Sequence, residues 1–324
     1  MQTQPVFPTA RMSRGMYESF YLRAFSPSEP VGVWIRHTVH KPSGKAPRGS
    51  IWCTVFDARR GAPLMHKITS SQLEVPPGEW IGVDGRASMG PERAVGNCGP
   101  ASWSLRFDSP EPPLRHLEPD WLYRSPLPRT KLTSPAPNAS FDGIVELEGH
   151  PTLELRGWHG MVGHNWGAEH AERWIWLHAA GFPDAPGAWL DVALGRLLIG
   201  GRMTPWVANG ALSLDGRRSR VGGLTKRPRV SESASGCELS LTGEEGLSIE
   251  ARVTVPDLGM AGWRYADPDG GEHDVLNCSI AAVELAVLSP TDKRRTLTVE
   301  HGGVYELGMR ERDHCIPIAP FADG

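Results

Sequence analysis

Three stretches near the start of the chain decide the fold: MYESFYLRAF at residues 16–25, VGVWIRHTV at residues 31–39 and SIWCTVFD at residues 50–57. β-branched and aromatic residues dominate each stretch, and short segments containing proline, glycine or serine separate them. This arrangement predicts an antiparallel meander. Alternation puts apolar and polar side chains on both faces of the predicted strands, whereas a sheet with one face in water would separate them cleanly. The pattern therefore indicates a polar-lined interior.

The strand pattern resumes at residues 144–309, and no long stretch shows clear helical periodicity. The 37 glycines and 29 prolines, about a fifth of the chain, also argue against long helices, because both residues interrupt the helical hydrogen-bond ladder. A proline-dense segment at 109–138 predicts an irregular connector. We therefore predict an all-β protein made of two consecutive antiparallel barrels or sandwiches. We expect residues 1–15 to form an irregular arm, residues 16–140 an N-terminal domain that ends in the connector, and residues 141–324 a C-terminal domain, with strand exchange between the domains left open.

Charge and cysteine content exclude several classes of function. The formal net charge is −3, so no global positive field attracts nucleic acid or an anionic membrane. No run of about 20 apolar residues and no signal-peptide pattern occurs, which predicts a cytoplasmic protein without stable membrane insertion. The five cysteines are widely spaced and form no CxxC pair, and no phosphate-binding glycine loop or GxSxG elbow is present. These absences argue against a disulfide framework, a zinc ribbon, nucleotide binding and serine catalysis.

The twelve tryptophans are the unusual feature of the composition, and several lie in RGWHGMVGHNWGAEHAERWIWLHAAG at residues 156–181. If residues 174–178 form a strand, Trp174, Trp176 and His178 share one face. The pattern predicts an apolar, aromatic-walled cavity with a few convergent polar groups, which is typical of a small-molecule site. Each of these side chains taken alone would more often belong to the core, so the prediction depends on their clustering.

Two neighbouring patterns extend the predicted cavity. Gly163 and Gly167 bracket the His-Asn-Trp triplet at 164–166, where they permit a close backbone approach that turns the polar side chains inward. Trp189 and Asp191 share one face of the next predicted strand. Desolvation in such a cavity would raise the pKa of a carboxyl group and lower that of a histidine, which is how a general acid or base is tuned.

The histidines of the segment do not predict a metal site. His159, His164, His170 and His178 are separated by five, six and eight residues, and these spacings match no HExxH or Cys/His ligand pattern. We therefore predict neither a metal nor another cofactor.

The N-terminal strands also carry candidates. Glu18, Tyr21, Arg36 and His37 are polar groups within predicted strands, where a buried and unpaired charge would be costly. Glu18 and Arg36 could form an exposed cross-strand ion pair, or they could belong to the site, and the sequence leaves both alternatives open.

The motif GHNWG at 163–167, followed by Trp-Ile-Trp at 174–176, resembles the signature of a lipocalin-like superfamily. This superfamily includes AttH-type proteins, carotenoid 1,2-hydratases (hydroxyneurosporene synthases), tocopherol cyclase-like proteins and lipocalin-like Diels–Alderases of fungi. ESFYL at 18–22 and WIRHT at 34–38 also look like the opening of AttH-like bacterial members. The resemblance covers residues 16–309 and implies two lipocalin-like β-barrel domains with a deep apolar pocket near their junction. It also implies chemistry in which polyenes, prenylated rings or polyketide chains are protonated, hydrated or cyclised without a metal or redox cofactor.

One departure from this family leaves the proton donor open. The hydratases carry a general acid in their tryptophan-rich strand region, whereas this chain has Asn165 between His164 and Trp166. The donor is then Asp191, Glu169 or Glu18, or there is none. Our leading hypothesis is a lyase or isomerase, a cyclase or hydratase of secondary metabolism that acts on a small hydrophobic terpenoid, polyene or polyketide-like substrate. The alternatives are a non-catalytic lipocalin-like carrier and a glycan-binding or structural β-sandwich.

The hypothesis assigns two sets of residues. The predicted catalytic residues are Asp191, His164, Glu18, His178 and Asn165. The predicted substrate-binding residues are Trp166, Trp174, Trp176, Trp189, Trp158, Tyr21, Trp34 and Arg36.

Overall fold

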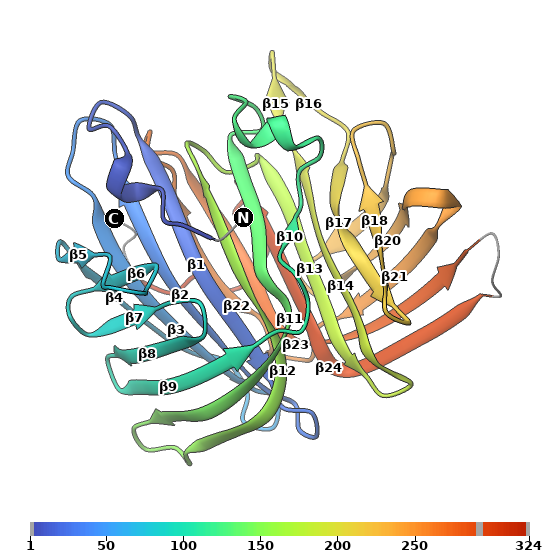
Figure 1. The fold of residues 1–324 in the computed structure, drawn as a ribbon, viewed down its shortest axis with the longest axis horizontal. Helices are drawn as coiled ribbons and strands as arrows, with labels where there is room; N and C mark the ends of the chain where they lie inside the picture. The colour runs from blue at the N-terminus through green and yellow to red at the C-terminus, as the bar shows by residue number, and fades with distance from the viewer. Residues whose placement is uncertain (1–2, 290–293, 322–324) are drawn as a thin grey trace.

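The computed structural model describes residues 3–289 and 294–321. Two large antiparallel sheets curve into barrel-like halves that lie side by side (Figure 1). Short 3-10 turns, η1 (Phe7–Thr9), η2 (Asp120–Tyr123) and η3 (Glu244–Gly246), are the helical elements of the described chain. Among these residues no helix is long and apolar enough to cross a membrane. The predicted all-β class is confirmed.

The first sheet has the order β4-β3-β2-β1-β12-β11-β9-β8-β7-β6-β5, with β10 paired to β11. Its opening strands β1, β2 and β3 form the predicted meander, with Tyr21 directly opposite Arg36 in the β1–β2 register. The strands are β1 (Met16–Phe25), β2 (Val31–Lys41), β3 (Arg48–Asp57), β4 (Leu64–Ser70), β5 (Leu73–Glu74), β6 (Ile81–Val83), β7 (Ala87–Met89), β8 (Arg93–Cys98), β9 (Ala101–Asp108), β10 (Leu114–Arg115), β11 (Thr130–Leu147) and β12 (Leu153–Gly167).

The second sheet has the order β18-β17-β14-β13-β24-β23-β21-β20-β19, with β22 paired to β23 and a separate β15–β16 ribbon. Within this sheet β13 lies between β14 and β24. The strands are β13 (Arg173–Phe182), β14 (Ala185–Arg196), β15 (Leu198–Ile199), β16 (Arg202–Met203), β17 (Val207–Leu214), β18 (Arg217–Gly222), β19 (Arg229–Ser233), β20 (Gly236–Thr242), β21 (Ser248–Thr254), β22 (Ala261–Ala266), β23 (Glu272–Leu288) and β24 (Arg295–Met309).

The chain passes from one sheet to the other between β12 and β13. The domain boundary expected at residues 140 and 141 falls inside β11, because β11 and β12 both pair in the first sheet. The expected irregular connector is likewise shorter than 109–138, since β11 begins at Thr130. Pro135 and Pro137 fit into this strand because its pairing with β12 shifts register around Ala136, so the ladder hydrogen bonds that proline lacks are interrupted there.

The two sheets share a core. Every residue of β1 is buried, and so are most residues of β2. Trp34 and Trp52 from the first sheet belong to the same apolar cluster as Trp263 from the second, with the Trp52 and Trp263 rings 4.9 Å apart. The mixed polar and apolar faces of β1 and β2 therefore reflect burial on both sides.

Candidate functional site

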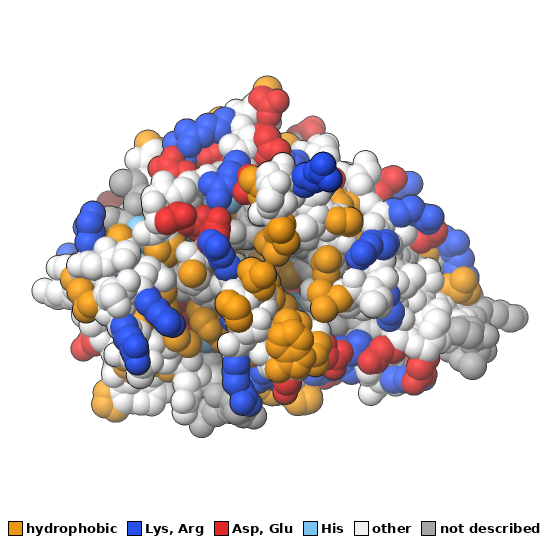
Figure 2. All heavy atoms as spheres, turned by 90° about the horizontal axis from the view of Figure 1, so that it is seen from above, with side chains coloured by type: hydrophobic (Ala, Val, Ile, Leu, Met, Phe, Trp, Pro, Cys, Tyr) orange, Lys and Arg blue, Asp and Glu red, His pale blue; other side chains and the backbone are white. Residues whose placement is uncertain are grey.

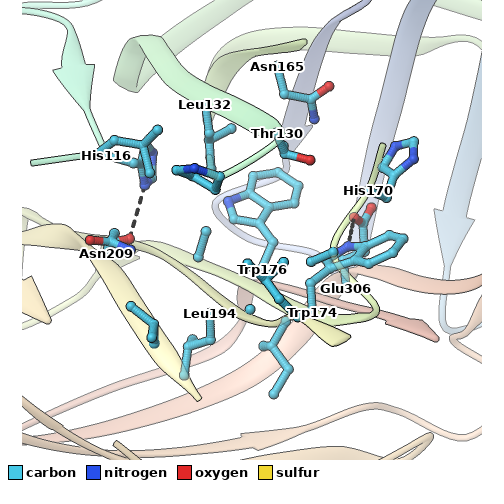
Figure 3. A pocket seen from close by; sticks show the side chains of 18 of the residues that line it. His116, Thr130, Leu132, Asn165, His170, Trp174, Trp176, Leu194, Asn209 and Glu306 are labelled. Atoms are coloured by element: carbon cyan, nitrogen blue, oxygen red, sulfur yellow. Dashed lines mark hydrogen bonds between the residues drawn. The ribbon is translucent and has the colours of Figure 1, made fainter. Parts of the chain in front are cut away.

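A cavity of about 360 Å³ lies between the two sheets, with part of the connector as its roof. Side chains from several strands project into this space (Figure 3), and apolar side chains surround a hollow near the middle of the face seen in Figure 2. Most of the wall is aromatic or aliphatic, which suits a hydrophobic ligand. The sequence-predicted residues that line it are Tyr21, Trp34, Arg36, Asn165, Trp174 and Trp176.

Two glycines allow the aromatic walls to lie flat on the sheets. A Cβ atom on Gly163 would be 2.1 Å from Cζ of Tyr21, its cross-strand partner in β1. A Cβ atom on Gly308 would be 2.1 Å from Cε2 and Cζ2 of Trp174, its partner in β13. The close backbone approach expected at Gly163 is therefore made by the Tyr21 ring.

The contact at Gly163 leads to a first prediction. Gly163→Ala is expected to push the Tyr21 ring toward the cavity and to lower the free energy of unfolding by about 1–3 kcal/mol, the usual cost of overpacking. Urea denaturation measures the stability, and quenching of tryptophan fluorescence by retinol measures binding in the narrowed cavity. Gly187→Ala is the matched control, because nothing lies within 4 Å of a Cβ atom there. Equal stability and equal retinol affinity in both variants would contradict the assigned role of Gly163.

Arg36 is a buried cation that forms no ion pair with the described residues. Arg36 is only 5% exposed. Its Nε donates to Ser19 Oγ at 2.7 Å, and its guanidinium lies 4.0 Å from the centre of the Tyr265 ring. Its Nη1 is buried without a hydrogen-bond partner, and none of the described carboxylates lies within ion-pair distance. Glu18 does not pair with Arg36, because its carboxylate binds the backbone of Val6 and Phe7 and lies beside His164. A buried guanidinium of this kind can bind an oxygen-bearing group of a ligand.

Tyr21 presents its phenol beside Arg36. Burial, followed by the negative charge of Asp191, raises the pKa of Tyr21 well above its usual value. The phenol therefore stays protonated, and within the described part of the chain its hydroxyl makes no hydrogen bond. Its ring meets the Trp176 indole edge to face, with centroids 5.1 Å apart. Tyr21 is thus an available hydrogen-bond donor in an apolar wall.

Glu306 supplies the carboxyl group of the cavity. It lies on β24 opposite Trp176, and it accepts hydrogen bonds from Trp174 Nε1 at 2.9 Å, Asn277 Nδ2 at 3.2 Å and Tyr265 Oη at 3.5 Å. Sequence reasoning did not assign Glu306 to the site. The signal that could have found it is a single acid in the otherwise apolar strand VYELGM at 304–309.

Asp191 lies behind the wall. It is fully buried, and it accepts hydrogen bonds from Ser134 Oγ at 2.5 Å and Trp176 Nε1 at 3.0 Å, while His116 Nε2 is 3.4 Å away. Burial alone would raise the pKa of Asp191, but its electrostatic and hydrogen-bond interactions with His116, its electrostatic interaction with His178 and the Ser134 hydrogen bond lower it to about 2. An ionised carboxylate of this kind holds Trp176 in place and is a poor proton donor.

Glu18 and His164 tie down the N-terminal arm. The carboxylate of Glu18 accepts the backbone N–H groups of Val6 at 2.8 Å and Phe7 at 2.7 Å, and it lies 2.7 Å from His164 Nε2. The His164 ring is stacked on Phe20 and on Trp166, with centroids 4.2 and 4.5 Å away. None of these four side chains lines the cavity: Glu18, Phe20, His164 and Trp166.

His178 and two of the remaining tryptophans are also outside the cavity. His178 Nε2 donates to the carbonyl oxygen of Pro137 at 2.8 Å, so Nδ1 accepts from Arg23 Nη1 at 2.9 Å. Burial, reinforced by the charge of Arg23, lowers the pKa of His178 to about 4, and the ring is neutral. Trp158 and Trp189 pack in separate apolar clusters.

Comparisons with known proteins address the fold. No family model matches the chain. Two uncharacterized proteins of Mycobacterium tuberculosis, from strains CDC 1551 and H37Rv, are each 26% identical over 310 residues, which is 94% of this chain and 89% of theirs. An AttH-like protein of Nitrosomonas europaea superposes with a TM-score of 0.57 at 16% identity, covering 94% of this chain and 96% of that one. This chain has the lipocalin-like fold of AttH-like proteins.

Two further crystal structures share this lipocalin-like fold. CghA with Sch210972 matches with a TM-score of 0.63 at 12% identity, covering 91% of this chain and 88% of CghA. Kievitone hydratase from Nectria haematococca matches with a TM-score of 0.55 at 11% identity, covering 94% and 90% of the two chains. The resemblance predicted from GHNWG and Trp-Ile-Trp is confirmed at the level of the fold, and a shared fold does not fix the substrate.

Proposed function

We propose that this protein is a cofactor-independent cyclase or hydratase that acts on a hydrophobic terpenoid, polyene or polyketide-like substrate bearing a carbonyl or carboxyl oxygen. The observation that carries the proposal is the pair Arg36 and Tyr21, a buried guanidinium with an unpaired Nη1 and a protonated phenol, which both belong to residues that line the aromatic cavity. The fold shared with a hydratase supports the reaction class by analogy.

The proposed role of Arg36 and Tyr21 is to bind the substrate oxygen. Hydrogen bonds from a cation and a phenol withdraw electron density from a carbonyl group and from the double bonds conjugated with it. Trp174 and Trp176 form flat walls that fold a flexible chain so that its reacting carbons meet. In a pericyclic cyclisation the new bonds form within the substrate from its own double bonds, and no external proton is needed.

The proposed role of Glu306 applies to a hydration. Its carboxylate takes a proton from water while the water oxygen bonds to the distal carbon of the conjugated double bond. The electron pair of that double bond moves to the carbonyl oxygen, where Arg36 and Tyr21 hold the negative charge. Return of the proton to the carbon next to the carbonyl completes the addition of water.

A hydrophobic-ligand carrier is the second candidate function. It is favoured by the placement of Asp191, Glu18 and His178, three of the predicted catalytic residues, which are bonded to protein groups and do not line the cavity. A carrier needs only the apolar walls and the Arg36 anchor.

The test separates turnover from binding. The protein is incubated with conjugated polyene ketones, prenylated phenols and polyene tetramic acids, products are analysed by mass spectrometry, and affinity is measured by tryptophan fluorescence. For a hydratase we expect Glu306→Gln to lower kcat by about 100-fold or more with little change in affinity. Glu300→Gln, an exposed residue of the same strand, is the control. Binding without any product supports the carrier, and neither binding nor product overturns both proposals.

A further inference from the structure

His170, Asp267 and His273 form a cluster of metal-ligating side chains at one end of the cavity. One nitrogen or oxygen atom from each of them lies within 4.8 Å of the others. His170 comes from the connection between β12 and β13, Asp267 from the turn between β22 and β23, and His273 from β23. His170 also lines the cavity, as Figure 3 shows.

The cluster holds several buried polar atoms that make no hydrogen bond. Within the described residues, both ring nitrogens of His273, Nε2 of His170 and Oδ2 of Asp267 make no hydrogen bond, and His273 Nδ1 lies 3.5 Å from Asp267 Oδ2. The side chains of His273 and Asp267 are fully buried. An unsatisfied buried donor or acceptor is costly and uncommon in folded proteins, so four in one place need an explanation. A bound cation would supply a partner for Asp267 Oδ2 and for one ring nitrogen of His273.

The remaining Asp267 oxygen orients one of the proposed ligands. Asp267 Oδ1 accepts from the backbone N–H of His170 at 2.9 Å and lies 2.7 Å from His170 Nδ1. His170 Nδ1 and the Asp267 carboxylate are therefore already close enough to share one cation, which would replace the hydrogen bond between them. The His170 ring is further fixed between Tyr17, with centroids 3.9 Å apart, and Trp174, at 5.3 Å.

One positive charge lies near the cluster. Arg310 Nη2 is 3.8 Å from Asp267 Oδ2. The same guanidinium is held by Glu172 Oε2, 2.8 Å from Nε, and approaches Glu169 Oε1 at 3.5 Å. Glu172 and Glu169 balance its charge, so Arg310 does not cancel the attraction of Asp267 for a cation.

We propose that His170, Asp267 and His273 bind a divalent transition metal, with Zn²⁺ as the natural occupant. Two imidazoles and one carboxylate suit Zn²⁺, Co²⁺ or Ni²⁺ and not the oxygen-seeking Mg²⁺ or Ca²⁺. Ligand atoms on one Zn²⁺ are about 3.3 Å apart, so modest side-chain movement closes the cluster. The cation would link the segment between β12 and β13 to the turn between β22 and β23 and to β23 itself. It would thereby fix the position of His170 in the cavity wall. This inference does not depend on the proposed reaction.

Cobalt titration tests the site with a spectroscopic readout. The full-length protein is stripped with EDTA, dialysed and titrated with Co²⁺, and the visible absorption band of bound Co²⁺ is recorded. We expect saturation at one equivalent and loss of the band when Zn²⁺ is added. His273→Gln and Asp267→Asn should each weaken Co²⁺ binding by about 100-fold or more, since even supporting residues of metal sites contribute 10- to 100-fold.

His66→Gln is the control, because His66 lies on β4, away from the cluster, and should keep full affinity. Circular dichroism of the stripped proteins shows whether the variants fold, and His170→Gln replaces any variant that does not. The inference is overturned if the wild type gives no band at one equivalent, or if His273→Gln and His170→Gln bind Co²⁺ as the wild type does. Because turnover is not measured, failure here leaves the proposed reaction untouched.

Discussion

Replacing Arg36 by methionine is expected to abolish the preference of the cavity for a polyene carboxylate over the matching alcohol. Hydrogen bonds to charged groups contribute about 1.5–3 kcal/mol, so we expect the affinity for retinoic acid to fall by about 10- to 100-fold. The affinity for retinol should change little, because the aromatic walls remain. Quenching of tryptophan fluorescence is a direct measurement, since Trp34, Trp174 and Trp176 line the cavity.

The stability of the protein should not fall with the same substitution, although the affinity for the carboxylate does. A buried charge without an ion-pair partner carries an uncompensated desolvation cost, so Arg36→Met is expected to leave the free energy of unfolding unchanged or to raise it. Arg59→Met, which removes an exposed arginine paired with Asp57 and Glu29, is the control for ligand affinity. Unchanged discrimination between retinoic acid and retinol in Arg36→Met would contradict the role of Arg36 as the oxygen anchor.

Asp191→Ala is expected to lower the free energy of unfolding by about 3–5 kcal/mol, the usual cost of removing one member of a buried charged network. The substitution leaves Ser134, Trp176 and His116 without their shared acceptor in a region closed to water. Urea denaturation at pH 7 measures the loss. Asp108→Ala is the control, since Asp108 is an exposed acid at the end of β9. A loss of less than 1 kcal/mol would show that Asp191 does not hold this wall.

The pH dependence of stability gives a second readout for Asp191. Its pKa is about 2 in the folded protein, below the value of about 3.9 for an unperturbed aspartate, so folding favours the ionised form. Its contribution is complete above about pH 4 and is lost as the pH falls toward 2. The wild type should therefore lose more stability than Asp191→Ala between pH 4 and 2. Parallel curves for the two proteins would contradict the lowered pKa.

Local patterns in the sequence were sufficient for the fold and for one wall of the cavity. The meander of β1 to β3 follows from strand propensity, and the placement of Trp174 and Trp176 follows from alternation along β13, which holds wherever a strand is regular. The lipocalin-like resemblance needed only short motifs around Gly163. These features depend on residues that are close together in the chain, so a single sequence contains them.

The partners of the polar groups depend on contacts that sequence spacing does not reveal. Asp191 faces Ser134 of β11 and His116 of the connector, and Glu18 binds the backbone of Val6 and Phe7. Glu306 and His273 reach the site region from strands more than 90 residues beyond the tryptophan motifs. Hydrogen-bond partners of this kind decide which acid is exposed to a ligand, and they are set only when the two sheets pack together.

The roof of the cavity allows ligand selectivity to change without disturbing the strand pairing that stabilises the fold. Leu122, Leu127 and Pro128 reach the cavity from the connector between β10 and β11, outside the strand ladders that hold Arg36 and Tyr21. Lys131 fastens this roof by donating to the carbonyl oxygens of Leu122 at 2.7 Å, Ser125 at 2.9 Å and Pro128 at 2.6 Å. Roof side chains can therefore change in size while their backbone stays anchored, and ligand selectivity can diverge among relatives without a penalty in strand pairing.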